Sequence, residues 1–205
     1  MFLVVALGNP GAEYQRNRHN VGFMVGEELR LRNGWPAFRT RFQGLFGDGQ
    51  MAGERVAVLL PLTFMNRSGQ AAAEAARYHR VSPESILAVH DDAELPFGEV
   101  RLKEGGGLGG HNGLRSMEER LGTRGYWRAR VGVGRPTSSR ISLADFVLSD
   151  FSEPREEVLL LVGAAADAVE AWVRAGGSDS AESAASGRPR GADAVPPADA
   201  APDGD

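Results

Sequence analysis

The sequence predicts a single-domain α/β fold, an α/β/α sandwich built on a twisted mixed, largely parallel sheet. Three observations support this prediction. Short runs of branched apolar residues recur along the chain, helical patterns of apolar residues separate them, and 205 residues are enough for one domain with a sizeable core. Strands that alternate with helices are typical of a sheet covered on both faces. We expect this domain to span residues 1–176.

Four apolar runs predict strands, at residues 2–7, 55–60, 85–90 and 128–134. Several of these runs lack the apolar and polar alternation of a strand with one solvated face, so we expect them to be buried on both faces. Residues 42–51 and 54–60 are close in sequence, which favours an antiparallel pair.

Apolar residues recur at helical spacing over residues 20–32, 66–79, 112–121 and 154–174. The last pattern has acidic residues in its first turn and Gly176 and Gly177 beyond its end, which are common signals of a helix start and stop. We therefore expect helices over these ranges, with the C-terminal one amphipathic.

Residues 177–205 are rich in Ala, Gly, Ser, Pro and Asp, with Val195 as their one large apolar residue. Six acidic residues against two arginines give this segment a formal charge of −4, which is the whole net charge of the chain. Too little apolar surface is present to offset the entropy of ordering it, so we predict a disordered acidic tail. The formally neutral remainder still allows a local basic face.

The chain contains no cysteine, which excludes disulfides, a thiol nucleophile and thiolate zinc sites. No stretch approaches the roughly 20 apolar residues that span a bilayer, and the N-terminus lacks the basic region of a signal peptide. We therefore expect a cytoplasmic protein without a membrane partner.

Five segments place polar groups just after an apolar run or at the start of a helix. They are residues 8–11 (Gly-Asn-Pro-Gly), 18–20 (Arg-His-Asn), 63–66 (Thr-Phe-Met-Asn), 90–92 (His-Asp-Asp) and the glycine-rich run 105–113. Ligands of open α/β sheets bind beyond the carboxyl ends of the strands. One shared site at that edge explains all five segments.

Each polar residue also has an ordinary structural interpretation. Asn9, before Pro-Gly, is typical of a tight turn, and Asn66 and Asn112 each precede a helical pattern, where asparagine is a common N-cap. His19 is compatible with a hydrogen-bonded buried histidine, and Asp91 with a cap on the loop after its strand. The residues alone leave these alternatives open.

Two other motifs argue against common chemistries. The glycine run suits phosphate binding at a helix N-terminus, but no Lys-Ser or Lys-Thr follows it, and residues 8–11 lack the third glycine of a dinucleotide fingerprint. Ser68 lacks the Gly-x-Ser-x-Gly elbow of a nucleophilic serine. His79, His90 and His111 have no metal-ligand spacing, so we expect no metal site.

A histidine, an aspartate and several asparagines suit the hydrolysis of a carbonyl ester by water. Histidine is the commonest general base, and an aspartate bonded to its other nitrogen fixes its tautomer and stabilises its protonated form. Asparagine amides bind a peptide backbone and donate to a developing oxyanion without adding charge.

The same segments resemble the bacterial peptidyl-tRNA hydrolase family. The resemblance covers about residues 1–175 and lies in ordered motifs: Ala-Leu-Gly-Asn-Pro-Gly-x-x-Tyr at 6–14, Arg-His-Asn-x-Gly at 18–22, Pro-x-Thr-Phe-Met-Asn-x-Ser-Gly at 61–69, His-Asp at 90–91, Gly-Gly-Gly-x-Gly-Gly-His-Asn-Gly at 105–113, and Arg-x-Gly-x-Gly at 130–134. It implies a monomeric, cofactor-free enzyme with a single α/β domain, which cuts the ester between a peptide and the terminal ribose of tRNA.

The resemblance also implies roles for individual residues. His19 matches the catalytic base, Asp91 the acid that stabilises the reactive form of His19, and Asn9 the residue that distinguishes a blocked from an unblocked amino group. The residues that match substrate-binding positions are Asn66, Asn112, Tyr14 and Phe64; ordinary core packing is the alternative for the two aromatic residues. The chain departs from the family's common Glu-Leu-Asp after His-Asp, because it has Asp92, Ala93 and Glu94 there.

Binding of tRNA should use phosphate contacts from basic side chains. The candidates cluster in the second half of the chain, near the glycine run: Arg101, Lys103, Arg115, Arg128, Arg130, Arg135 and Arg140. Two other functions stay open, a hydrolase of small acyl esters or amides and a non-catalytic RNA-binding module on the same scaffold.

Overall fold

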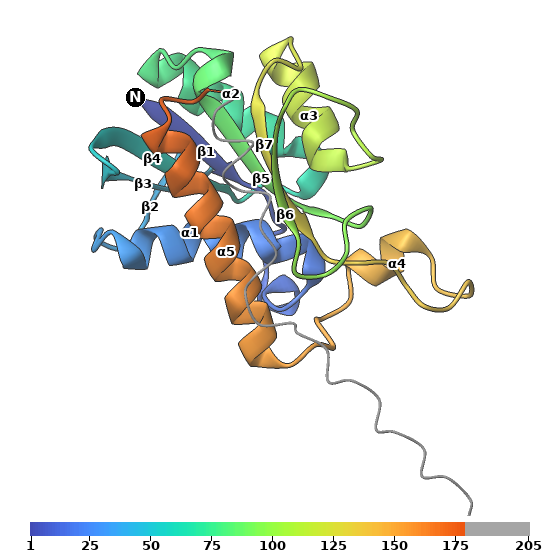
Figure 1. Cartoon of the computed structure of the whole chain (residues 1–205). Coiled ribbons are helices and arrows are strands. Elements are labelled where there is room, and N and C mark those ends of the chain that lie inside the picture. Colours follow the sequence, from blue (N-terminus) through green and yellow to red (C-terminus); the bar gives the residue numbers. More distant parts are fainter. Residues whose placement is uncertain (179–205) are drawn as a thin grey trace, which may run out of the picture.

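The computed structural model describes residues 1–178. The predicted tail therefore lies outside the described residues, except for its first two positions. Within the described part, strands and helices alternate along most of the chain, and the sheet lies between two layers of helices (Figure 1).

The sheet has seven strands in the order β2-β3-β4-β1-β5-β7-β6 within residues 1–178 (Figure 1). Its central strands β4, β1, β5 and β7 run parallel, whereas β2, β3 and β6 pair antiparallel with their neighbours. The bounds are Phe2–Ala6 for β1, Arg39–Arg41 for β2, Gly44–Met51 for β3, Glu54–Pro61 for β4, Ile86–Asp92 for β5, Val100–Glu104 for β6 and Trp127–Gly132 for β7. The predicted mixed sheet is confirmed, and so is the antiparallel pair of β3 and β4.

Two helices cover each face of the sheet. Helices α1 (Val21–Arg32) and α5 (Arg155–Arg174) pack on one face, and α2 (Ser68–His79) and α3 (Asn112–Leu121) on the other. The side chains of β1 alternate between the two cores, with Val4 facing α1 and α5 and Leu3 facing α2 and α3. Burial of β1 on both faces explains its continuous apolar sequence.

Apart from short 3-10 turns, the structure adds three elements that were not predicted, β2, β6 and the short helix α4 (Leu143–Val147). It also begins α2 at Ser68, after a 3-10 turn over Met65–Arg67, where a helix was expected from residue 66. Asn66 therefore lies in the turn before α2.

Two glycines let helices approach their neighbours closely near the site. A Cβ atom on Gly22 would lie 2.3 Å from the carbonyl oxygen of Leu7, so only glycine lets the start of α1 pack directly on the backbone just after β1. A Cβ atom on Gly69 would lie 2.0 Å from the carbonyl oxygen of Ser116, which fixes α2 tightly against α3. These contacts place the first turns of α1, α2 and α3 around one edge of the sheet.

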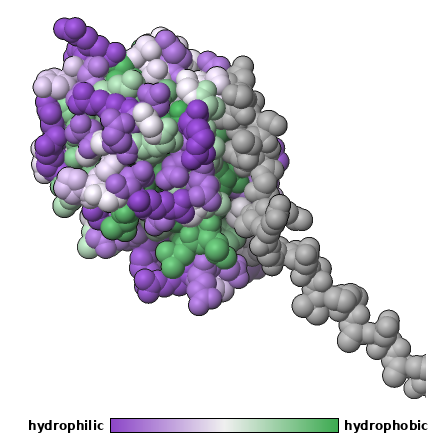
Figure 2. Space-filling model, turned by 60° about the vertical axis from the view of Figure 1, so that its left-hand side comes forward, coloured by the Kyte–Doolittle hydropathy of each residue, from purple (hydrophilic) through white to green (hydrophobic). Residues whose placement is uncertain are grey.

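On the face that Figure 2 shows, hydrophilic residues predominate and apolar residues form smaller patches between them. Among the described residues, no helix has the length and apolar character needed to cross a bilayer.

Candidate active site

A cleft of about 480 Å³ lies at the carboxyl edge of the parallel strands. All five polar segments contribute residues to its lining, together with α4 and the residue that follows it. The lining residues are Asn9, His19, residues 64–66, residues 90–94, residues 108–112, and Leu143, Ala144, Val147 and Leu148. The expected convergence of the polar segments at this edge is what the structure shows.

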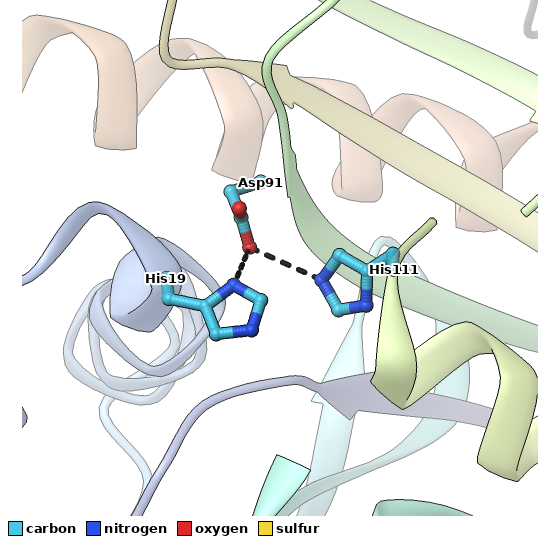
Figure 3. Close-up of side chains that lie close together, drawn as sticks. All are labelled: His19, Asp91 and His111. Atoms are coloured by element: carbon cyan, nitrogen blue, oxygen red, sulfur yellow. Dashed lines mark hydrogen bonds and ion pairs between the residues drawn. The ribbon is translucent and has the colours of Figure 1, made fainter. Parts of the chain in front are cut away.

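Asp91 lies between two histidines at the floor of the cleft (Figure 3). Its Oδ1 atom is 2.7 Å from Nδ1 of His19 and 3.1 Å from Nε2 of His111. The carboxylate is buried, at 5% exposure, and it comes from the carboxyl end of β5, where a buried strand delivers a polar side chain to the edge. The His19 and His111 rings are 4.8 Å apart between centroids.

The hydrogen bonds assign the tautomer of His111. Its Nδ1 atom accepts from the backbone N–H groups of Gly113 and Leu114, at 3.1 and 3.4 Å, and so caps the N-terminus of α3. A ring nitrogen that accepts carries no proton, so the proton of the neutral ring lies on Nε2 and is donated to Asp91. His111 is thus a fixed donor to the carboxylate.

The tautomer of His19 follows from the same carboxylate. An ionised Asp91 only accepts, so Nδ1 of His19 donates to it and Nε2 of the neutral ring carries a lone pair. In Figure 3 this second nitrogen points away from Asp91. The ring is therefore oriented as a base, with its acceptor atom free for a proton from the cleft.

The electrostatics of the site keep Asp91 charged and His90 neutral. Burial by itself would raise the pKa of Asp91, but electrostatic attraction to His19 and His111 and hydrogen bonds from their N–H groups lower that pKa well below its ordinary value. Burial, with a contribution from His111, lowers the pKa of His90 to about 3. His90 donates from Nδ1 to the backbone carbonyl of Asp91 at 2.7 Å and so supports the strand end.

His19, Asp91 and His111 also form a group whose potential ligand atoms lie within 4.8 Å of one another. To ligate a metal, His111 would have to release the proton of Nε2 and place one on Nδ1, which already faces two backbone N–H donors. The hydrogen bonds therefore favour a proton network over a metal centre at these residues.

Asn9 is held so that its amide nitrogen is left to donate. Its side-chain oxygen accepts from the backbone N–H of Met65 at 2.8 Å. Asn20 binds the backbone of Asn9 twice, accepting from its N–H and donating to its carbonyl, both at 2.9 Å. The buried Asn9 is thus fixed by two neighbouring segments.

The two remaining asparagines do not cap helices. Arg67 occupies the N-cap position of α2 and His111 that of α3, so Asn66 and Asn112 are exposed side chains at the rim of the cleft. Phe64, at 59% exposure, lines the cleft beside Asn66. Tyr14 is half-buried and is not among the residues that line the cleft.

The seven basic candidates differ in their surroundings. Arg128 is buried, at 2% exposure, and it donates to the carbonyl of Gly107 at 2.5 Å, so it holds the glycine loop and faces away from solvent. Arg130 is half-buried and binds Asp92 at 2.7 Å, and Arg135 is paired with Glu94. Asp92 and Glu94, which stand where the family's common pattern has Glu and Asp, therefore bind two of the predicted phosphate contacts. The exposed candidates are Arg101, Lys103, Arg115, Arg135 and Arg140, of which Arg101 is paired with Glu99.

A family model described as "Peptidyl-tRNA hydrolase" matches residues 3–191. The chain belongs to the peptidyl-tRNA hydrolase family. A peptidyl-tRNA hydrolase of Rhodospirillum centenum is 52% identical over 159 residues, which cover 78% of this chain and 69% of the relative. A peptidyl-tRNA hydrolase of Geobacter sp. strain M21 is 47% identical over 175 residues, which cover 85% of this chain and 92% of the relative.

Solved structures agree with the family. The crystal structure of peptidyl-tRNA hydrolase from Acinetobacter baumannii is similar with a TM-score of 0.81 and 36% identity, over 92% of this chain and 95% of that one. A peptidyl-tRNA hydrolase in complex with N-propanol gives a TM-score of 0.82 and 35% identity, over 93% and 97%. The resemblance found in the motifs therefore extends over the described fold.

Sequence reasoning missed three residues that shape this peptidyl-tRNA hydrolase site. His111 and Asn20 stood inside the motifs but were given no role of their own. A polar residue before the helical pattern of α3 indicated an N-cap there, but from the sequence that cap was assigned to Asn112, whereas His111 provides it. Arg18 also stood in a motif, but its partners lie more than 130 residues away.

Proposed function

We propose that this chain hydrolyses the ester bond between the C-terminus of a peptide and the 3′-terminal ribose of tRNA. The observation that carries the proposal is the geometry of His19, which donates from Nδ1 to the buried Asp91 and presents Nε2 to the cleft. Family membership supplies the substrate class, and the relatives' names support it.

In the proposed mechanism, Nε2 of His19 takes a proton from a water molecule as the water oxygen attacks the ester carbonyl carbon. The resulting imidazolium is stabilised by Asp91, whose negative charge is preserved by its lowered pKa. When the tetrahedral intermediate collapses, the bond to the ribose oxygen breaks and His19 returns the proton to that oxygen. The products are a tRNA with a free terminal hydroxyl and a peptide carboxylic acid, which becomes a carboxylate by releasing its remaining proton to solvent.

The asparagines bind and orient the substrate in this proposal. The amide nitrogen of Asn9 is left to donate to a carbonyl, so a blocked amino group suits it and a free ammonium does not. Asn66 and Asn112, at the rim, are placed to bind the peptide backbone and to donate to the oxyanion. Phe64 offers an exposed ring for stacking or apolar contact, and Tyr14 would contact parts of the substrate beyond the cleft.

The proposal includes tRNA contacts outside the cleft. Exposed basic side chains near the glycine loop, Lys103 and Arg115 among them, are available for phosphates, whereas Arg128 acts by holding that loop. We infer that the protein acts as a monomer in the cytoplasm, where peptidyl-tRNA is produced.

Hydrolysis of N-acetyl-aminoacyl-tRNA, compared with unblocked aminoacyl-tRNA, tests the function. With spontaneous deacylation subtracted, we expect the wild type to cleave only the blocked substrate and His19→Ala to cleave neither. A folded wild type that cleaves neither substrate would support a binding module. A kcat/KM on a small acyl ester equal to that on N-acetyl-aminoacyl-tRNA would support a hydrolase of small acyl esters.

A further inference from the structure

A buried arginine precedes His19 in the chain and has no place in the chemistry above. Arg18 is 2% exposed and begins the 3-10 turn Arg18–Asn20 that carries the base. A buried guanidinium is unfavourable unless it is paired and hydrogen-bonded. The hydrogen bonds that its Nη1 and Nη2 atoms donate all go to residues 149–153.

The guanidinium of Arg18 binds four residues of that segment. Nη1 donates to Oγ of Ser149 at 3.0 Å and to the backbone carbonyl of Asp150. Nη2 donates to Oγ of Ser152 at 3.0 Å and to Oε2 of Glu153 at 2.9 Å. The planar fork of arginine provides these paired directions, which the single ammonium of lysine does not.

Aromatic and backbone contacts complete this anchor. The guanidinium carbon lies 4.3 Å from the ring centroid of Phe146 and 5.2 Å from that of Phe151. The backbone N–H of Arg18 donates to the carbonyl of Ser149 at 3.1 Å, and the side chain of Asn17 donates to the carbonyl of Leu148. The turn that carries His19 and the end of α4 are therefore joined directly.

Helix α4 has little other attachment to the body of the protein. Within residues 1–178, neither hydrophobic core includes a residue from 135–150. Yet Leu143, Ala144, Val147 and Leu148 form an apolar wall of the cleft. The position of this wall relative to the base thus depends on the contacts around Arg18.

We propose that Arg18 is a positioning residue for substrate binding, which holds the α4 wall at a fixed distance from His19. The wall is apolar, so the part of the substrate it contacts is the side chains of the esterified peptide. The identity of the substrate in this proposal rests on the proposed function, whereas the anchoring of α4 by Arg18 is independent of it. Loss of the anchor should weaken binding of peptidyl-tRNA and leave proton transfer by His19 in place.

The test compares Arg18→Met, Arg18→Lys and Glu153→Gln with Arg30→Met. Arg30 is a matched control because it also pairs with a carboxylate, that of Glu27, and lies outside the residues that line the cleft. We expect Arg18→Met to raise KM for N-acetyl-aminoacyl-tRNA about tenfold while kcat changes by less than about threefold. Arg18→Lys should recover only part of the loss, and Arg30→Met should leave KM unchanged.

Amide hydrogen exchange of residues 143–150 gives a second readout that does not depend on activity. It should become faster in Arg18→Met and Glu153→Gln and stay unchanged in Arg30→Met. Unchanged KM and exchange in a folded Arg18→Met protein would overturn the proposal, as would a loss confined to kcat. If Arg18→Met does not fold, Arg18→Lys and Glu153→Gln decide by the same two measurements. If the wild type does not hydrolyse the substrate, the proposed function fails, while exchange still tests the anchor.

Discussion

Replacement of His111 by asparagine separates its two roles in the structure. The ring caps α3 through Nδ1 and binds Asp91 through Nε2. Asparagine is among the best N-cap residues, so His111→Asn should keep the cap, but its shorter side chain cannot also reach the carboxylate. The change therefore removes one of the two donors that orient Asp91 and preserves the start of α3.

The expected magnitude follows from the lost bond. A hydrogen bond to a charged group contributes about 1.5–3 kcal/mol, and every 1.4 kcal/mol in the barrier changes the rate about tenfold. If the whole free energy of the bond between His111 and Asp91 stabilises the transition state, kcat of His111→Asn should fall about 10- to 100-fold. KM should change little, because the bond joins two protein side chains at the cleft floor and is not a bond to the substrate.

Steady-state hydrolysis of N-acetyl-aminoacyl-tRNA and thermal unfolding, measured together, check this expectation. His111→Ala is the control, since it removes the cap as well and should cost about 1 kcal/mol more stability than His111→Asn. A His111→Asn enzyme with wild-type kcat would show that the contact with Asp91 has no part in catalysis. A low kcat in the alanine variant alone would assign the effect to the cap.

Three further predictions concern the same site and its surroundings. Asp91→Asn should lower kcat about 10³–10⁴-fold in single-turnover assays, because the amide disturbs the tautomer of His19, and near-normal turnover would contradict that role. Since the pKa of His90 is lowered to about 3, the unfolded chain binds a proton that the folded protein does not, so stability is lost as pH falls below about 6.5, by up to about 1.4 kcal/mol per pH unit. Urea unfolding between pH 6 and 4.5 should show a smaller slope for His90→Asn than for the wild type, and equal slopes would refute this. The double change Lys103→Glu and Arg115→Glu should raise KM for tRNA substrates about tenfold and spare a peptidyl-nucleoside; an equal loss on both substrates would exclude a phosphate-binding role.

The elements that the sequence predicted are those whose pattern of apolar residues reflects how they are buried. Strands β1, β4 and β5 contain continuous apolar runs because helices cover both faces of the sheet there, whereas in β7 Arg128 and Arg130 alternate with buried apolar residues. Strand β6 was missed although Val100 and Leu102 alternate with charged residues, since two apolar positions are a weak signal. The short β2, Arg39–Arg41, has no apolar residue at all and forms only through its pairing with β3.

Part of the site could also be predicted, because the residues concerned occupy positions that the fold brings together. Polar residues at strand ends and helix starts converge in this fold, so His19, Asp91 and Asn9 were found by position and residue type. Arg128 was predicted as a surface cation, yet it is buried on β7, within the run 128–134 that the sequence predicted as a strand. The partners of Arg18 are set by packing between distant segments, which no local pattern encodes.

The central claim is that His19 presents an unprotonated Nε2 to the cleft while Asp91 holds its Nδ1 proton. Nitrogen-15 NMR of the imidazole rings, at a pH where both rings are neutral, tests it directly by reporting which nitrogen carries the proton. The account predicts a proton on Nδ1 of His19 and on Nε2 of His111. A His19 ring protonated on Nε2 would contradict it, because a nitrogen that already holds a proton cannot take one from water.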